Sequence, residues 1–266
     1  MKKKRIIPLV LFKNGYVVQA RGFSSHKRLG FLGPTLTRLE EWGADEIIVV
    51  NISPADKAPE APVGRTDLAD EFDFDFTRAV RNHAGRTSVP LTIGGGIRGF
   101  YQAAQCFEIG ADKVLINSGF HLDKGLVPKI AGEFGSQAVV LGVDYKLVNG
   151  IRQVFIQSGQ ESVGKSVSEV AQAASDLGAG EFFLSSIDRD GMKQGLDLDV
   201  IAQVAELRTP VIVCGGVGEA KHITDGLRLR SVDGVAAANY FQHVENSVQL
   251  SRNLAATEGI LVRHLR

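Results

Sequence analysis

Eight short apolar segments, each followed by a helical pattern, run from one end of the chain to the other. The segments are four to seven residues long and rich in Ile, Val, Leu and Phe, which is typical of parallel strands buried on both faces. They cover residues 5–11, 46–52, 89–93, 113–117, 138–144, 181–187, 211–214 and 234–238. Amphipathic patterns predict helices at residues 35–42, 68–83, 100–108, 122–134, 167–177, 197–207, 219–228 and about 244–257.

This alternation predicts an α/β fold in which a parallel sheet closes into a (β/α)8 barrel, also called a TIM barrel. A doubly wound open sheet is the alternative, but the even spacing of the units and the lack of a long linker favour closure. The length of 266 residues suits one such barrel, so we expect a single domain over residues 1–266.

The sequence also repeats itself about half a barrel apart. Residues 43–52 (GADEIIVVNI) align with residues 178–187 (GAGEFFLSSI), and residues 90–97 (PLTIGGGI) align with residues 210–217 (PVIVCGGV). A doubled four-unit half barrel explains both matches. Chance similarity between βα units is the alternative.

Charge and composition limit the function classes. The 30 Lys and Arg residues balance 30 Asp and Glu residues, and 44% of the chain is hydrophobic. These values exclude intrinsic disorder and disfavour a nucleic-acid or anionic-membrane partner. Two cysteines and no apolar run of ~18 residues predict a soluble protein of the reducing cytoplasm. Residues 54–67, which hold three prolines, predict an inserted loop after the second strand, on the catalytic face.

Glycines follow the third and seventh predicted strands, at Gly95 and Gly96 and at Gly215 and Gly216. Glycines at strand ends let backbone N–H groups approach an anion closely. Because the two pairs are related by the repeat, we expect two phosphate sites and an elongated substrate; tight structural turns are the alternative. Further candidates for phosphate binding at strand or loop ends are Asn117, Ser118, Gly191, Ala238 and Asn239. Asn117 could instead cap the following helix.

Candidate acid–base groups also lie at strand ends. Asp144 ends the fifth predicted strand, where partial burial raises a carboxyl pKa toward the range useful for proton transfer. Capping a helix or pairing with Lys146 is the alternative. Ser185 and Asp190 follow the sixth strand and could bind a sugar or position a base. No histidine or cysteine spacing predicts a metal site, and no nicotinamide fingerprint is present, so we expect no cofactor.

Five segments of the chain carry a more specific signal: RIIP at 5–8, PLTIGGGIR at 90–98, GADKVLINS at 110–118, FGSQ at 134–137 and SIDRDG at 186–191. Together they resemble the cyclase (synthase) subunit of imidazole glycerol phosphate synthase. The similarity covers nearly the whole chain, whereas the related isomerase of histidine biosynthesis matches these segments less well. The resemblance implies a barrel that docks on a glutaminase subunit through its N-terminal face and conducts ammonia to an acid–base site at the other end.

The resemblance also assigns residues at the barrel bottom. A charged ammonia gate of the family matches Arg5, Glu46, Lys113 and Glu181, and Asp112 matches a residue at the glutaminase interface. Four such charges inside a barrel would be costly unless they paired across it. Ordinary solvent-facing charges at strand starts are the alternative.

The upper face departs from the family pattern. Leu11 stands where the family has its first catalytic aspartate, Asn51 replaces the aspartate that ends the second strand, and Gln19 replaces the lysine of the first loop. In this respect the chain resembles a side branch of the family, whose members have an apolar residue in place of the first aspartate. Those members supply ammonia for acetamidino groups on surface-polysaccharide sugars, so the resemblance implies a sugar amidotransferase as a further partner. An authentic histidine-pathway cyclase and a non-catalytic scaffold that activates a glutaminase remain the alternatives.

Overall fold

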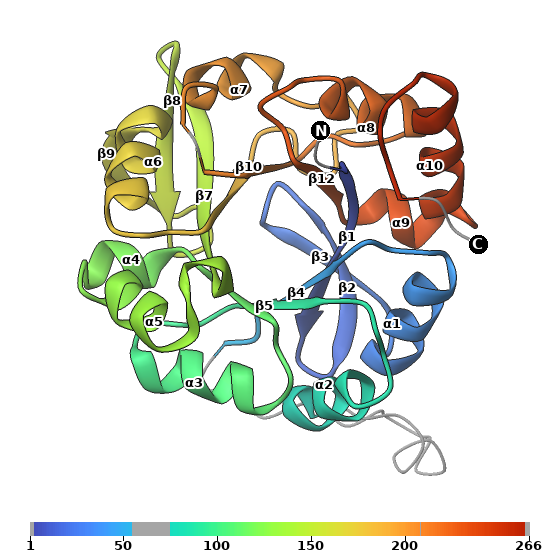
Figure 1. Ribbon diagram of the computed structural model, residues 1–266, viewed down its shortest axis with the longest axis horizontal. Coiled ribbons are helices and arrows are strands. Elements are labelled where there is room, and N and C mark those ends of the chain that lie inside the picture. Colours follow the sequence, from blue (N-terminus) through green and yellow to red (C-terminus); the bar gives the residue numbers. More distant parts are fainter. Residues whose placement is uncertain (1–2, 55–74, 208, 264–266) are drawn as a thin grey trace.

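A computed structural model describes residues 3–54, 75–207 and 209–263. Eight parallel strands of this part form a closed barrel because β10 pairs with both β11 and β7, so the open-sheet alternative is wrong (Figure 1). The predicted loop at 54–67 lies outside the described residues except for Pro54. The barrel strands are β1 (Arg5–Lys13), β4 (Ile47–Asn51), β5 (Leu91–Gly94), β6 (Lys113–Ile116), β7 (Val139–Val148), β10 (Glu181–Ser186), β11 (Val211–Cys214) and β12 (Gly234–Ala237).

Helices cover the outside of the barrel (Figure 1). The predicted helix at 100–108 is confirmed with its bounds, whereas the pattern at 122–134 covers the last residue of one helix, α4 (Ser118–Leu122), and all of another, α5 (Leu126–Phe134). The other helices are α1 (Leu32–Glu41), α2 (Phe76–Ala84), α3 (Phe100–Glu108), α6 (Val167–Asp176), α7 (Leu198–Val204), α8 (Ala220–Leu227), α9 (Asn239–His243) and α10 (Ser247–Thr257), with a 3₁₀ turn at Ser136–Ala138. No described helix is long and apolar enough to span a membrane.

The barrel has two separate apolar cores because successive side chains of a strand point to opposite faces. Outward-facing residues such as Ile6, Val10 and Ile47 pack against the helices. Inward-facing residues form a second cluster inside the barrel, the lumen cluster: Ile7, Leu9, Ile48, Leu115, Val140, Phe183, Ile212, Cys214 and Ala236. None of these nine side chains is more than 8% exposed, so the described barrel interior is packed and apolar.

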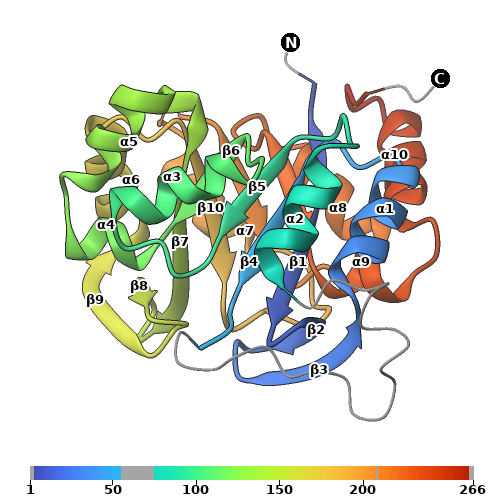
Figure 2. The same cartoon turned by 90° about the horizontal axis from the view of Figure 1, so that it is seen from below.

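Two of the barrel strands continue into antiparallel extensions that the strand prediction missed. After β1 come β2 (Tyr16–Arg21) and β3 (Ser25–Gly30), and after β7 come β8 (Ile151–Ile156) and β9 (Glu161–Ser166). Figure 2 shows both extensions at the end of the barrel where the parallel strands terminate. Each begins at an Asn-Gly turn with positive φ, at Asn14 and Asn149, and this dipeptide between apolar runs is a hairpin signal.

The backbone around two glycines agrees with the internal repeat. A Cβ on Gly95 would lie 1.9 Å from the carbonyl oxygen of Asn51, and a Cβ on Gly215 would lie 2.7 Å from that of Ser186. Both glycines have positive φ, +99° and +103°. Since residues 51 and 186 are themselves equivalent in the repeat, the two halves share the same close approach of a glycine turn to the neighbouring strand end.

Candidate functional site

Four charged side chains meet at the N-terminal end of the barrel, and we call them the charge ring: Arg5, Glu46, Lys113 and Glu181. Arg5, Lys113 and Glu181 are the first residues of β1, β6 and β10, and Glu46 directly precedes β4. The Arg5 guanidinium lies 2.6 Å from Glu46 and also pairs with Glu181. The Lys113 ammonium lies 2.9 Å from each carboxylate. Each cation therefore bridges both anions.

The charge ring is buried and depends on this pairing. Glu46 and Glu181 are only 2% and 4% exposed, so the interpretation of these residues as solvent-facing charges is wrong. Burial alone would lower the pKa of Arg5, but its hydrogen bonds and ion pairs with Glu181 and Glu46 raise it above its ordinary value. Burial would raise the pKa of Glu181, and Arg5 and Lys113 outweigh that effect and lower it. Isolated charges at this depth would be strongly unfavourable.

Thr92 is a member of this site that the sequence reasoning missed. Its hydroxyl is fully buried in β5 and donates a 2.6 Å hydrogen bond to Oε1 of Glu46. Glu46 therefore accepts hydrogen bonds from three side chains, whereas Glu181 accepts from the two cations. Thr92 pairs with Lys113 in the parallel register of β5 and β6, so the two side chains point to the same face of the sheet. Since Lys113 was expected to point into the barrel, the residue beside it on the neighbouring strand could have been predicted to join the charge ring.

At the opposite end of the barrel, which we call the mouth, one side is apolar and the other is polar. Leu11 and Val50 are register partners on β1 and β4, and both pack on the lumen cluster together with Ala238. Facing them across the barrel, Asp144 of β7 is the register partner of Ser185 of β10. The mouth thus presents hydrocarbon on one half and hydrogen-bonding groups on the other.

Asp144 is the central group of the polar half. Asn117 donates a hydrogen bond from Nδ2 to Oδ2 of Asp144 over 2.6 Å. Burial raises the pKa of Asp144 to about 7, the hydrogen bond from Asn117 offsets part of the rise, and the charge of Asp190 adds to it. Lys146 donates instead to the carbonyl of Gly159, so the predicted alternative of an Asp144–Lys146 pair is wrong. A carboxyl group with this pKa can both accept and donate protons near neutral pH.

Asp190 lies in the loop after β10 and connects that loop to the extension of β1. Burial raises its pKa, and backbone hydrogen bonds from Phe23 and Gly22 offset part of the rise. The Phe23 amide donates to the Asp190 carboxylate over 3.3 Å, and the Gly22 amide donates to its carbonyl over 3.1 Å. The next residue, Gly191, has φ +72°, and a Cβ there would lie 3.0 Å from the carbonyl of Ala20.

The structure places the predicted phosphate-binding residues around the mouth. Gly96 has φ +69°, and no atom lies within 4 Å of where its Cβ would be, whereas a Cβ on Gly216 would lie 2.1 Å from the carbonyl of Gly195. Asn117 precedes α4 but makes no side-chain cap, since its amide bonds Asp144. Their role in phosphate binding stays a prediction.

Two polar side chains of this predicted set are already engaged with the protein. The Ser118 hydroxyl accepts a hydrogen bond from the backbone amide of Gln157 over 3.1 Å. Asn239 is 7% exposed and donates from Nδ2 to the carbonyl of Ala20 over 2.8 Å. Asn239 therefore holds the extension of β1 against the barrel, and the backbone near Ala238 remains the candidate for phosphate contact.

The three positions that depart from the family pattern are occupied in distinct ways. Leu11 packs on the lumen cluster. The Asn51 side chain accepts a hydrogen bond from the amide of Ser53 over 3.0 Å, a local turn typical of asparagine. Gln19 Oε1 lies 3.0 Å from Nε2 of His243 on α9. None of these three side chains is an acid or a base that could transfer a proton near neutral pH.

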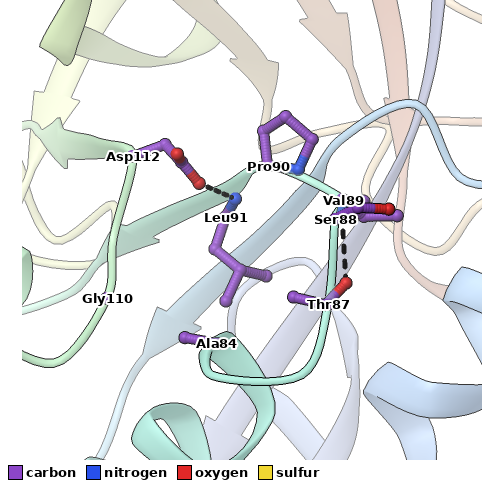
Figure 3. A pocket seen from close by; sticks show the side chains of 8 residues that line it. All are labelled: Ala84, Thr87, Ser88, Val89, Pro90, Leu91, Gly110 and Asp112. Atoms are coloured by element: carbon purple, nitrogen blue, oxygen red, sulfur yellow. Dashed lines mark hydrogen bonds between the residues drawn. The ribbon is translucent and has the colours of Figure 1, made fainter.

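Asp112 lies next to the charge ring on the N-terminal face, at the edge of a shallow hollow of about 160 Å³. Its carboxylate accepts a 2.8 Å hydrogen bond from the backbone amide of Leu91, as Figure 3 shows. The hollow is lined by Ala84, Thr87, Ser88, Val89, Pro90, Leu91, Gly110 and Asp112. It lies at the opposite end of the barrel from Asp144. The assignment of Asp112 to a partner interface stays a prediction.

Within the described ranges, no group of three or more His, Cys, Asp or Glu residues is arranged to hold a metal ion. Asp144 and Asp190, two carboxyl groups with raised pKa values, give the described mouth groups that are suited to proton transfer.

One comparison with known proteins covers nearly the whole barrel. Residues 5–246 match the model of a family described as "Histidine biosynthesis protein". The matched region contains all eight barrel strands, the charge ring and the mouth. This family is made up of enzymes of isomerase and cyclase type that share the barrel fold, and the match does not distinguish between the two types. The chain belongs to the histidine biosynthesis protein family.

Proposed function

We propose that this chain is the barrel subunit of a glutamine amidotransferase complex. In this proposal, a glutaminase subunit docks on the N-terminal face, and ammonia enters at the charge ring and crosses the lumen. At the mouth it reacts with a phosphorylated small molecule. We further propose that the acceptor has diverged from that of the histidine pathway toward an acetamidino-sugar or a similar nitrogen transfer.

The observation that carries the proposal is the placement of three features along one barrel. The buried charge ring closes one end, the lumen cluster fills the middle, and Asp144 stands at the other end. An apolar interior strongly disfavours a charged ammonium ion but not neutral ammonia. Ammonia that crossed this packed apolar interior would therefore reach the mouth as the neutral, nucleophilic molecule.

The mouth suits the second half of such a reaction. When ammonia attacks an electrophilic carbon, the new nitrogen must lose a proton and the departing group must gain one. Asp144, with a pKa of about 7, is able to carry out either step near neutral pH, and Asp190 is a second carboxyl group with a raised pKa. We assign the phosphate groups of the acceptor to the two glycine turns, Gly95–Gly96 and Gly215–Gly216, whose four glycines have positive φ.

Leu11, on the apolar half of the mouth, supports the proposal that the ammonia acceptor differs from that of the histidine pathway. Leu11 transfers no proton, and losing one acid or base typically costs about 10²–10⁴ in rate. A site that kept the acceptor of the histidine pathway would retain that group. The second candidate function, an authentic cyclase, is favoured by the intact charge ring and by Asp144 paired with Asn117.

An assay with the phosphoribulosyl-formimino substrate of the histidine pathway and ammonium salt separates these readings. We expect no imidazole glycerol phosphate from the natural sequence and measurable turnover from the double variant Leu11→Asp, Asn51→Asp. Turnover at an ordinary enzymatic rate by the natural sequence would establish the authentic cyclase instead. Inactivity of both proteins would favour a non-catalytic scaffold that activates a glutaminase.

A further inference from the structure

The loop that follows β10, residues 188–197, is attached at both ends to the extension of β7, and we call it the β10 loop. At its start, the backbone amide of Leu147 donates a 2.7 Å hydrogen bond to the Asp188 carboxylate. At its end, Arg152 donates to both carboxylate oxygens of Asp197, over 2.6 and 2.7 Å. Leu147 and Arg152 are register partners on β7 and β8, so one pair of opposed hairpin residues holds both ends of the loop.

The contact between Arg152 and Asp197 is a shielded ion pair. The two side chains are only 14% and 9% exposed, and two parallel hydrogen bonds fix their relative orientation. Burial would raise the pKa of Asp197, but the hydrogen bonds and the charge of Arg152 outweigh that effect and lower it. Removing the arginine would leave a carboxylate with little access to water, so the pair constrains the end of the β10 loop.

A second arginine carries this constraint across the loop to Asp190. Arg189 directly precedes Asp190 in the sequence. Its Nη1 atom donates to the carbonyl oxygens of Gly195 and Leu196, over 3.1 and 3.3 Å. Since Leu196 directly precedes Asp197, Arg189 connects the residue before Asp190 to the segment that the ion pair holds.

The charges of this network act on one buried side chain, Tyr145 of β7, which is 2% exposed. Burial raises the pKa of Tyr145, the charge of Asp197 adds to the rise, and the charges of Arg152 and Arg189 offset part of it. Because electrostatic effects weaken with distance, the two arginines and Asp197 form one cluster around this tyrosine. Tyr145 directly follows Asp144, so the cluster lies beside the mouth.

The β10 loop also contacts a glycine turn and the extension of β1. The Gly195 amide donates to the carbonyl of Gly216 over 2.8 Å. Asp190 accepts the hydrogen bonds of Gly22 and Phe23 described above. The loop therefore joins both hairpin extensions at the mouth, and its position determines where the Asp190 carboxylate lies.

We propose that Arg152, Asp197 and Arg189 form a clamp that positions Asp190 at the mouth. Arg152 holds the end of the β10 loop through Asp197, and Arg189 ties that end to the residue before Asp190. The three residues act through Asp190 and are positioning residues. The part that Asp190 plays in turnover rests on the proposed function, whereas its placement by the clamp does not.

Loss of the clamp should lower the pKa of both carboxyl groups at the mouth. Burial raises the pKa of Asp190 and outweighs the opposing hydrogen bonds from Phe23 and Gly22. Water that reaches a released loop therefore moves this pKa down toward the ordinary value of 3.8. The charge of Asp190 also adds to the raised pKa of Asp144, so moving that charge away lowers the pKa of Asp144 as well.

The test is carbon-13 NMR of the labelled aspartate carboxyl groups in the full chain over a pH series, with Asp190→Asn and Asp144→Asn assigning the signals. We expect Arg152→Gln to lower the pKa of Asp190 and, by a smaller amount, that of Asp144. Arg152→Lys keeps the charge but loses the two-bond contact, so it should give an intermediate shift. Since Arg152 and Asp197 act as a pair, adding Asp197→Asn to Arg152→Gln should lower the pKa of Asp190 no further.

Arg228→Gln is the matched control. Arg228 lies at the C-terminal end of α8 and forms a 3.1 Å ion pair with Glu258, so this variant also removes an arginine–carboxylate contact, but outside the clamp. The pKa values of Asp190 and Asp144 should stay as in the natural sequence, even if thermal stability falls. An unchanged pKa of Asp190 in both Arg152 variants, or an equal fall in Arg228→Gln, would overturn the inference.

Failure of the clamp and failure of the proposed function give different results, because this titration needs neither a glutaminase nor an acceptor. If the pKa of Asp190 falls in Arg152→Gln but the chain does not stimulate a glutaminase, the clamp stands and the proposed function falls. If the chain stimulates a glutaminase and the pKa of Asp190 does not change, the clamp falls and the proposed function stands.

Discussion

Leu11 and Asp144 occupy equivalent places in the two half barrels. Each lies at the mouth on a strand that continues into a hairpin with an Asn-Gly turn, and the two strands, β1 and β7, face each other across the barrel. Leu11 contacts apolar neighbours, while Asp144 accepts a hydrogen bond from Asn117. Of these two equivalent positions at the mouth, only the one on β7 therefore carries an ionisable side chain.

Replacing Asp144 should remove catalysis. In the Leu11→Asp, Asn51→Asp background, we expect Asp144→Asn to lower the rate of imidazole glycerol phosphate formation by about 10²–10⁴, since one proton-transfer group is lost. The assay uses ammonium salt, so no partner subunit is needed. Asp176→Asn, on the exposed end of α6, is the control and should retain the rate. An active Asp144→Asn variant would remove Asp144 from the mechanism.

Asn117 should set the pKa of Asp144. Its amide donates to the carboxylate and so favours the charged form, which lowers the pKa. Asn117→Ala should therefore raise the pKa of Asp144 above its value of about 7. Carbon-13 NMR of the labelled carboxyl group over a pH series measures this directly. A pKa that falls or stays constant would show that the hydrogen bond does not control the protonation of Asp144.

Asp144 should also reduce stability at alkaline pH. Its folded-state pKa of about 7 exceeds the ordinary value of 3.8, so the folded state binds more protons than the unfolded state between these values and loses stability as the pH rises through them. At pH 8, Asp144→Asn should raise the free energy of unfolding, on the order of 2–4 kcal/mol. At pH 4 the gain should nearly vanish. Urea unfolding at the two pH values measures the difference, and an equal gain at both would contradict it.

The charge ring should matter for folding and for glutamine-dependent turnover. Glu46→Gln leaves Arg5 and Lys113 with one carboxylate, so we expect a loss of about 3–5 kcal/mol in the free energy of unfolding. In the Leu11→Asp, Asn51→Asp background, turnover with ammonium salt should persist while turnover with glutamine and a glutaminase decreases. Glu161→Gln, on the exposed extension of β7, is the control. Equal losses with both nitrogen sources would place Glu46 in the acceptor site instead.

The barrel could be predicted because a strand that is buried on both faces is a nearly continuous run of apolar residues, which is easy to recognise in a sequence. The Glu-Phe-Phe-Leu segment at Glu181 shows this, because its outward residues pack on helices and its inward ones fill the lumen. The extension of β1 was missed because β3 is mostly polar and has no buried residue, so it leaves no apolar run. Its signal lay in Asn14 and Gly15, whose positive φ values form the hairpin turn.

The pairing of Asn117 with Asp144 was not predictable from either strand alone. The two residues lie 27 positions apart and meet because β6 and β7 are parallel neighbours. Strand-end position predicted that both would lie at the mouth, but the choice of partner depends on the register and on side-chain rotamers. The same reason explains why Asp190 was placed at the site but its contacts with Gly22 and Phe23 were not foreseen.

The central claim, that a glutaminase docks on the face that carries the charge ring, is tested most directly by one titration. The measurement is the rate of glutamine hydrolysis by the glutaminase subunit of the same organism as this chain is added. We predict that the rate rises and saturates at one chain per glutaminase, that Asp112→Lys weakens the effect, and that Glu161→Lys at the other end does not. A rate that is unchanged at every ratio of the two proteins would contradict the account.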